Sequence, residues 1–315
     1  MKTAAAVLLL LIAGIAAPRI AGQERDEEIV ANIAAGRVII QATGEGIAFA
    51  VMEQPSESGS LPPRVISLNS THIGVLLGAA EWQIPAGSKP LRVEQGLPQI
   101  PGTRRESEES SDLEFIGVAF LERLRELAGR LHHKIELGPE EPILQVVVIG
   151  YGPETYGPEV WLYEYRVKQE ALRGDYYQTK VLRPRSTQLY PPEKGAPRTL
   201  VEIAYPAEAV APGLLERIER NDPAVARIAG SEKKFDRVVE KIRAGKAQTA
   251  NPDDAAEFLR IMVVPMAGKG RFAVGTFKVN RGFDWLLPPE EPVEKVVEDK
   301  KRPPEAPTLR RKPQP

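Results

Sequence analysis

Aromatic residues that can make binding contacts gather in one segment of the chain. All eight tyrosines lie between Tyr151 and Tyr205, and two of them belong to the tandem repeat YGPETYGPE at 151–159. Tyrosine and tryptophan supply large, rigid, amphipathic contact area with few torsions to freeze. The segment therefore predicts a surface that binds a protein or a glycan. The predicted contact residues are Tyr151, Tyr156, Trp161, Tyr163, Tyr165 and Tyr190.

A packing role is the alternative for the same residues. Residues 160–168 alternate, with Trp161, Tyr163 and Tyr165 on one face, and aromatic side chains favour strands for packing reasons alone. A purely structural envelope protein would keep these side chains buried.

Acidic residues in this segment suggest a third reading, a hydrolase of envelope polymers. Glu154, Glu159 and Glu164 could supply paired carboxylates, which glycoside hydrolysis needs at a defined separation. A one-dimensional sequence does not show that separation, so no catalytic residue is assigned. We lean toward a protein that is not an enzyme.

Metal and cofactor chemistry has little support in the residue types. The chain has no cysteine, which excludes thiol catalysis, cysteine–zinc sites and iron–sulfur ligation. It has three histidines, and His132 and His133 are adjacent, so on a helix they point about 100° apart. We predict no metal site and no cofactor. The net charge of -1 also gives no electrostatic case for nucleic acid.

The amino terminus resembles an export signal. Lys2 is followed by the uncharged run Ala4 to Ala17, which is short for a spanning helix and has small residues near its end. We predict a signal peptide at 1–22 with cleavage near Gln23, and a periplasmic or extracellular protein. An uncleaved amino-terminal anchor is the alternative. No later apolar run is long enough to span a membrane.

Composition divides the remaining chain into four parts. A small β-rich unit at 23–85 is followed by a linker at 86–111, rich in Pro, Gly, Ser and charge. An α+β domain at 112–287 combines an antiparallel sheet with packed helices. A tail at 288–315, with eight prolines among its residues, is predicted to be disordered.

Hydrophobic periodicity and turn residues predict the elements within these parts. Residues 143–149 (ILQVVVI) are nearly continuously apolar, which is typical of a central strand covered on both faces. A short extended piece is expected at 91–93 inside the linker. The other predicted strands are 37–42, 46–52, 64–68, 72–77, 160–168, 176–182, 199–205 and 271–279. One helix is predicted to begin directly after Ser111. The other predicted helices occupy 212–220, 223–229, 231–244 and about 252–263.

Overall fold

The computed structural model describes residues 29–53, 63–69, 71–83, 89–98, 112–138, 140–151, 157–174, 176–192, 200–206, 212–278 and 281–289. The fold is mixed α/β, with three antiparallel sheets and five α-helices among these residues. This confirms the predicted α+β character. The predicted signal peptide and most of the predicted tail lie outside the described residues.

The largest sheet has the strand order β1-β5-β7-β8-β11, and β4 and β6 also pair with β5. Strand β7 is buried along its whole length between β5 and β8, as the apolar run predicted. The seven strands are β1 (Val30–Ala34), β4 (Arg64–Ser67), β5 (His72–Gln83), β6 (Leu91–Arg92), β7 (Leu144–Tyr151), β8 (Pro158–Tyr165) and β11 (Arg185–Tyr190).

The second sheet has the order β12-β2-β3-β13-β14. Its hairpin between β2 and β3 closes where Thr43 N donates to Gly46 O at 2.8 Å, between the strands predicted at 37–42 and 46–52. The five strands are β2 (Gly36–Ala42), β3 (Gly46–Glu53), β12 (Leu200–Tyr205), β13 (Phe272–Lys278) and β14 (Gly282–Leu287). A third, two-stranded sheet consists of β9 (Val167–Arg173) and β10 (Tyr176–Val181).

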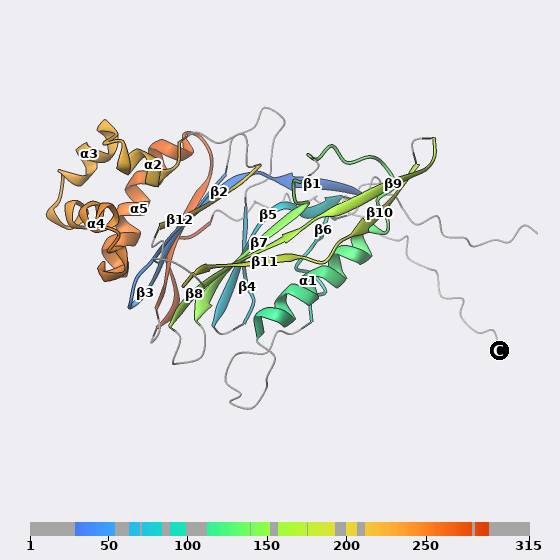
Figure 1. The fold of residues 1–315 in the computed structure, drawn as a ribbon, viewed down its shortest axis with the longest axis horizontal. Coiled ribbons are helices and arrows are strands. Elements are labelled where there is room, and N and C mark those ends of the chain that lie inside the picture. The colour runs from blue at the N-terminus through green and yellow to red at the C-terminus, as the bar shows by residue number, and fades with distance from the viewer. Residues whose placement is uncertain are drawn as a thin grey trace, which may run out of the picture.

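The two large sheets pack face to face, and helices cover both outer faces. Phe49 and Ile40 from the second sheet share a buried cluster with Val75 and Val147 from the first. Helix α1 covers the other face of the first sheet, while α2–α5 cover the second sheet (Figure 1). The helices are α1 (Asp112–Ala128), α2 (Leu214–Glu219), α3 (Pro223–Ala229), α4 (Lys233–Arg243) and α5 (Pro252–Ala267), and a short 3₁₀ helix spans Ala247–Thr249.

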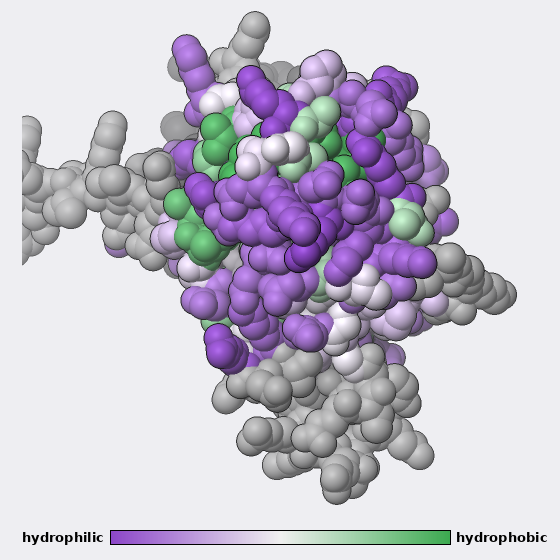
Figure 2. All heavy atoms as spheres, turned by 90° about the vertical axis from the view of Figure 1, so that its left-hand side faces the viewer, coloured by the Kyte–Doolittle hydropathy of each residue, from purple (hydrophilic) through white to green (hydrophobic). Residues whose placement is uncertain are grey.

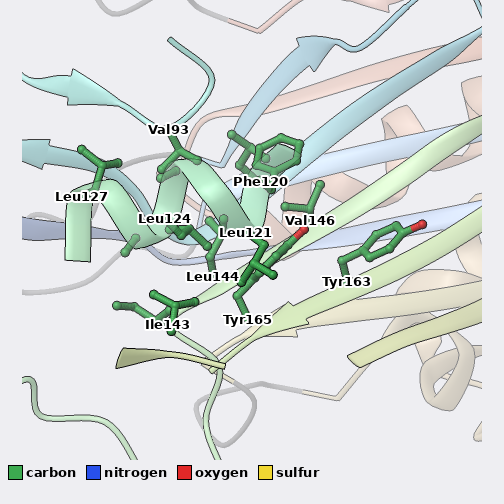
Figure 3. Close-up of a cluster of buried hydrophobic side chains, with 14 of the residues drawn as sticks. Val93, Phe120, Leu121, Leu124, Leu127, Ile143, Leu144, Val146, Tyr163 and Tyr165 are labelled. Atoms are coloured by element: carbon green, nitrogen blue, oxygen red, sulfur yellow. The ribbon is translucent and has the colours of Figure 1, made fainter. Parts of the chain in front are cut away.

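Helix α1 packs through the apolar stripe that its sequence predicts. Phe120 and Leu124 are fully buried, and their side chains lie between the helix and the strands (Figure 3). Burying side chains of this size contributes about 1.5–3 kcal/mol each. The stripe therefore holds α1 against the first sheet.

The strands of the predicted 23–85 unit do not form a sheet of their own among the described residues. Strand β5 pairs with β7, β2 pairs with β12, and β3 pairs with β13. Both large sheets are thus built from early and late parts of the chain. The predicted linker also contributes to the first sheet, because β6 pairs with β5 and Val93 is fully buried. This confirms the extended piece that was predicted at 91–93.

Three strands were not predicted from the sequence, and one predicted strand is longer than the observed one. Residues 160–168 are parts of two strands, β8 and β9, which are separated at Arg166. Strand β11 lies between the strands predicted at 176–182 and 199–205, where no strand was predicted, and β1 and β14 were also not predicted. β11 is mostly polar (RSTQLY), so no apolar alternation marked it, and its pairing with β8 decides its conformation.

Candidate functional site

The predicted tyrosines of β8 anchor helix α1. Tyr163 Oη donates to Leu113 O at 2.7 Å, and Tyr165 Oη donates to Gly117 O at 3.0 Å. Figure 3 shows the Tyr165 side chain beside the helix. Burial, and then the neighbouring Tyr163, raises the pKa of the Tyr165 hydroxyl well above its usual value. These hydroxyls therefore stay protonated and act as donors to the helix backbone.

The other predicted contact residues are more varied. Tyr151 is buried between the sheets and stacks on Phe277, with ring centroids 5.4 Å apart. Trp161 is half-buried, and its Nε1 donates to Glu159 Oε2 at 3.1 Å. Tyr190 is half-buried at the end of β11, while Tyr156 lies outside the described residues.

This placement puts three of the six predicted contact residues inside the fold. Tyr151, Tyr163 and Tyr165 each expose 6% or less of their surface, so a partner cannot reach them in this conformation. The physical reason is that the first sheet is covered on both faces: α1 covers Tyr163 and Tyr165 of β8, and the second sheet covers Tyr151 of β7. Tyr176, which was not among the predicted residues, exposes 48% and stacks on His132.

The structure also places the predicted carboxylates. Glu159 shares the α1 face of β8 with Trp161, whereas Glu164 belongs to the alternate set of residues, which faces the second sheet. These two carboxylates therefore cannot attack one substrate together. Glu154 lies outside the described residues.

A polar cluster that the sequence analysis did not identify crosses three strands. The fully buried His72 begins β5, and its Nε2 lies 2.8 Å from Glu159 Oε1 on β8. The imidazole passes over Gly150 of β7, where an added Cβ would lie 2.3 Å from His72 Cδ2. On the other side of the ring, Nδ1 lies 3.0 Å from Thr71 Oγ1.

This cluster joins a hydroxyl, an imidazole and a carboxylate, the three groups of a nucleophile–base–acid relay. The Thr71 hydroxyl also lies 3.1 Å from Asn69 Oδ1, which accepts from the Thr71 and His72 backbone N–H groups as well. Glycine at 150 makes the arrangement possible, and the sequence held no signal for it.

A groove of about 720 Å³ opens beside the edge strand β12. Residues 200–204 of β12 form one wall, and residues 188, 189 and 192 at the end of β11 contribute to the other. Leu162 and Gln145 come from the first sheet. Helix α2 adds Leu215, Glu216 and Glu219, and Gly213 lines the groove just before the helix begins. The groove therefore involves much of the 151–205 segment, although not the predicted tyrosines.

Some polar groups in the groove have hydrogen-bond partners and others do not. Glu202 accepts from Arg37 Nη1 at 3.2 Å and from Leu215 N at 2.8 Å. Gln145 is 7% exposed; its amide Nε2 donates to Glu164 at 3.4 Å. Its buried Oε1 has no hydrogen-bond partner among the described residues.

Gln145 was missed, although a signal for it existed in the sequence. It is the one polar residue in the apolar run ILQVVVI. A buried acceptor without a partner costs about 1–3 kcal/mol, so such a residue in a central strand points to a binding role or a bound water.

The remaining surfaces provide less evidence for a binding site. The face formed by α2–α5 is mostly hydrophilic (Figure 2). Where the structure describes the chain, no cluster of three or more His, Asp or Glu could hold a metal ion. None of the described helices combines the length and the apolar character that crossing a membrane requires.

Comparison with known proteins adds no family to this description. No protein-family model matches the chain, and no curated protein sequence matches it. The candidate site is therefore the groove beside β12, with the His72–Glu159 cluster as a second polar site.

Proposed function

We propose that this chain is an exported, non-catalytic protein that binds another envelope or secreted protein through the groove beside β12. The observation that carries the proposal is the open groove with the buried, unpartnered Gln145 Oε1 in its lining. The proposal of export rests on the uncharged run Ala4 to Ala17.

Site-specific photocrosslinking in the native host tests the binding role. Leu189 lines the groove, whereas Leu172 is 59% exposed on the β9–β10 hairpin and is not part of the groove lining. A photoreactive phenylalanine at position 189 should capture a discrete protein that the same residue at position 172 does not capture. Identical products from the two positions, or none, would favour a purely structural role.

Amino-terminal sequencing of the protein from its host tests export. A mature chain that begins near Gln23 is expected. A folded cytoplasmic product that still begins with Met1 would contradict the proposal.

A hydrolase is the second candidate, and of the predicted carboxylates it keeps only Glu159. The unbroken contacts from Thr71 through His72 to Glu159 favour acyl transfer with Thr71 as the nucleophile. A fluorophosphonate probe should then label the wild type and fail to label His72→Gln. Absence of labelling in the folded wild type would reject this candidate.

A further inference from the structure

The free edge of β12 can be identified from the hydrogen-bond register of the second sheet. Thr43 N donates to Gly46 O, which makes this a hydrogen-bonded pair of the β2–β3 ladder. Alternate residues of β2 then bond to β3, and the residues between them, such as Ile40 and Val38, bond to β12 on the other side.

The partners of those β2 residues on β12 are Val201 and Ile203. Among the residues that the structure describes, strand β12 pairs only with β2, at the edge of the sheet. The N–H and C=O groups of Leu200, Glu202 and Ala204 therefore point away from β2.

The groove follows this free edge. All five residues 200–204 line it, although alternate residues of a strand point to opposite faces of a sheet. Leu200 packs toward the helices and Ile203 toward the other sheet. A groove that touches both sets must run along the edge of the strand, where the outward peptide groups lie.

The lining has an acidic character. It contains three glutamates, and no lysine, arginine or histidine is among the lining residues that the structure describes. Glu202 is neutralised by Arg37, and Glu216 lies against Arg220 at the helix surface. Glu219 forms no ion pair with any residue that the structure describes. With the Gln145 acceptor, the groove favours a ligand that brings hydrogen-bond donors and positive charge.

We propose that the groove binds an extended, basic peptide segment of a partner protein, which adds as a strand to the free edge of β12. This inference rests on the proposed function and names the partner's chemistry. Main-chain hydrogen bonds to Leu200, Glu202 and Ala204 would supply affinity. Lysine or arginine side chains of the peptide would lie near Glu216 and Glu219 and supply selectivity.

Fluorescence polarisation with a labelled heptapeptide, TKVRTKV, tests the proposal on the full mature chain. The acidic peptide TEVETEV is the matched control and should not bind. The double variant Glu216→Gln/Glu219→Gln should weaken binding of the basic peptide about fivefold, as expected for two surface charges. Equal binding of the two peptides, or an unchanged double variant, would overturn the charge argument.

Backbone methylation of the peptide tests strand pairing without altering the protein. In an added strand, alternate peptide N–H groups face β12. N-methylation of one alternate set should abolish binding, while methylation of the other set should leave it within about twofold. Ala204→Pro should also abolish binding, because proline removes an outward N–H at an edge position that tolerates it. Equal effects of the two methylation patterns would reject strand addition.

The remaining outcomes separate this inference from the proposed function. A partner captured from position 189, together with no binding of TKVRTKV, would overturn the basic-strand inference and leave the proposed function standing. Loss of both signals would remove both. A dimer in sedimentation that Ala204→Pro dissociates would assign the groove to a second copy of the chain and overturn the inference.

Discussion

Replacing Gly117 by alanine tests how tightly α1 is docked on β8. Glycine inside a helix is less favourable than alanine by about 0.8–1 kcal/mol, so propensity alone predicts that Gly117→Ala stabilises the protein. The structure predicts the opposite. An added Cβ would lie 2.9 Å from Tyr163 Cε1 and 3.2 Å from Tyr163 Cδ1.

The Tyr163 ring has little freedom to move away. It is 4% exposed, and its hydroxyl donates to Leu113 O at 2.7 Å. Overpacking of this kind costs about 1–3 kcal/mol, and displacing the ring would also weaken a hydrogen bond worth about 1 kcal/mol. After the propensity gain is subtracted, we expect a net loss of about 1–3 kcal/mol in the free energy of unfolding.

Urea unfolding followed by circular dichroism measures this change, with an unchanged m-value as the check on two-state comparison. The matched background is Tyr163→Val, in which the ring is absent and Gly117→Ala should stabilise by about 1 kcal/mol. If Gly117→Ala were neutral or stabilising in the wild-type background, the proposed contact between α1 and β8 would be refuted.

Three further predictions concern other parts of the fold. Gly150→Ala should lower the free energy of unfolding by about 3 kcal/mol or more, because its Cβ would lie 2.3 Å from His72 Cδ2; urea unfolding would contradict this if the loss were below about 1 kcal/mol. Burial acts to raise the pKa of Glu53, but hydrogen bonds from the Arg271 side chain and backbone, with its charge, lower it overall. Since the folded pKa lies below the unfolded value, the stability advantage of wild type over Glu53→Gln should be present at neutral pH and shrink as pH falls below about 4, and a pH-independent difference would contradict this. The Gln169 side chain donates to a backbone carbonyl and accepts from a backbone N–H in the segment after α1, so Gln169→Ala should speed hydrogen exchange in the β9–β10 hairpin while leaving global unfolding unchanged; unaltered exchange there would be evidence against this anchoring.

Local patterns predicted the elements whose residues carry their own signal. The apolar stripe of α1 specifies a helix with one buried face, and the continuous run of β7 specifies a strand buried on both faces; the structure has both. The turn at Thr43 was predictable because its residues favour a hairpin. Strand β11 was not predictable in this way, because its polar sequence becomes a strand through pairing with β8.

The candidate sites also include features that the sequence indicated and features that it did not. The sequence indicated that the 151–205 segment was unusual, but not whether its tyrosines face outward or inward. The burial of Tyr163 and Tyr165 depends on α1 lying across β8, and that of Tyr151 depends on the second sheet. The sequence also contained Gln145 as an isolated polar residue, yet gave no sign that it would line a groove beside β12.

By itself, the sequence determined the α+β character, the positions of the strongly periodic elements and the absence of thiol chemistry, because these depend on residue types and short spacings. Tertiary structure alone decided that early and late strands share both sheets, that His72 meets Glu159 across Gly150, and that β12 has a free edge along an acidic groove. Each of these depends on contacts between residues far apart in the chain, and such contacts leave no local pattern for a single sequence to reveal.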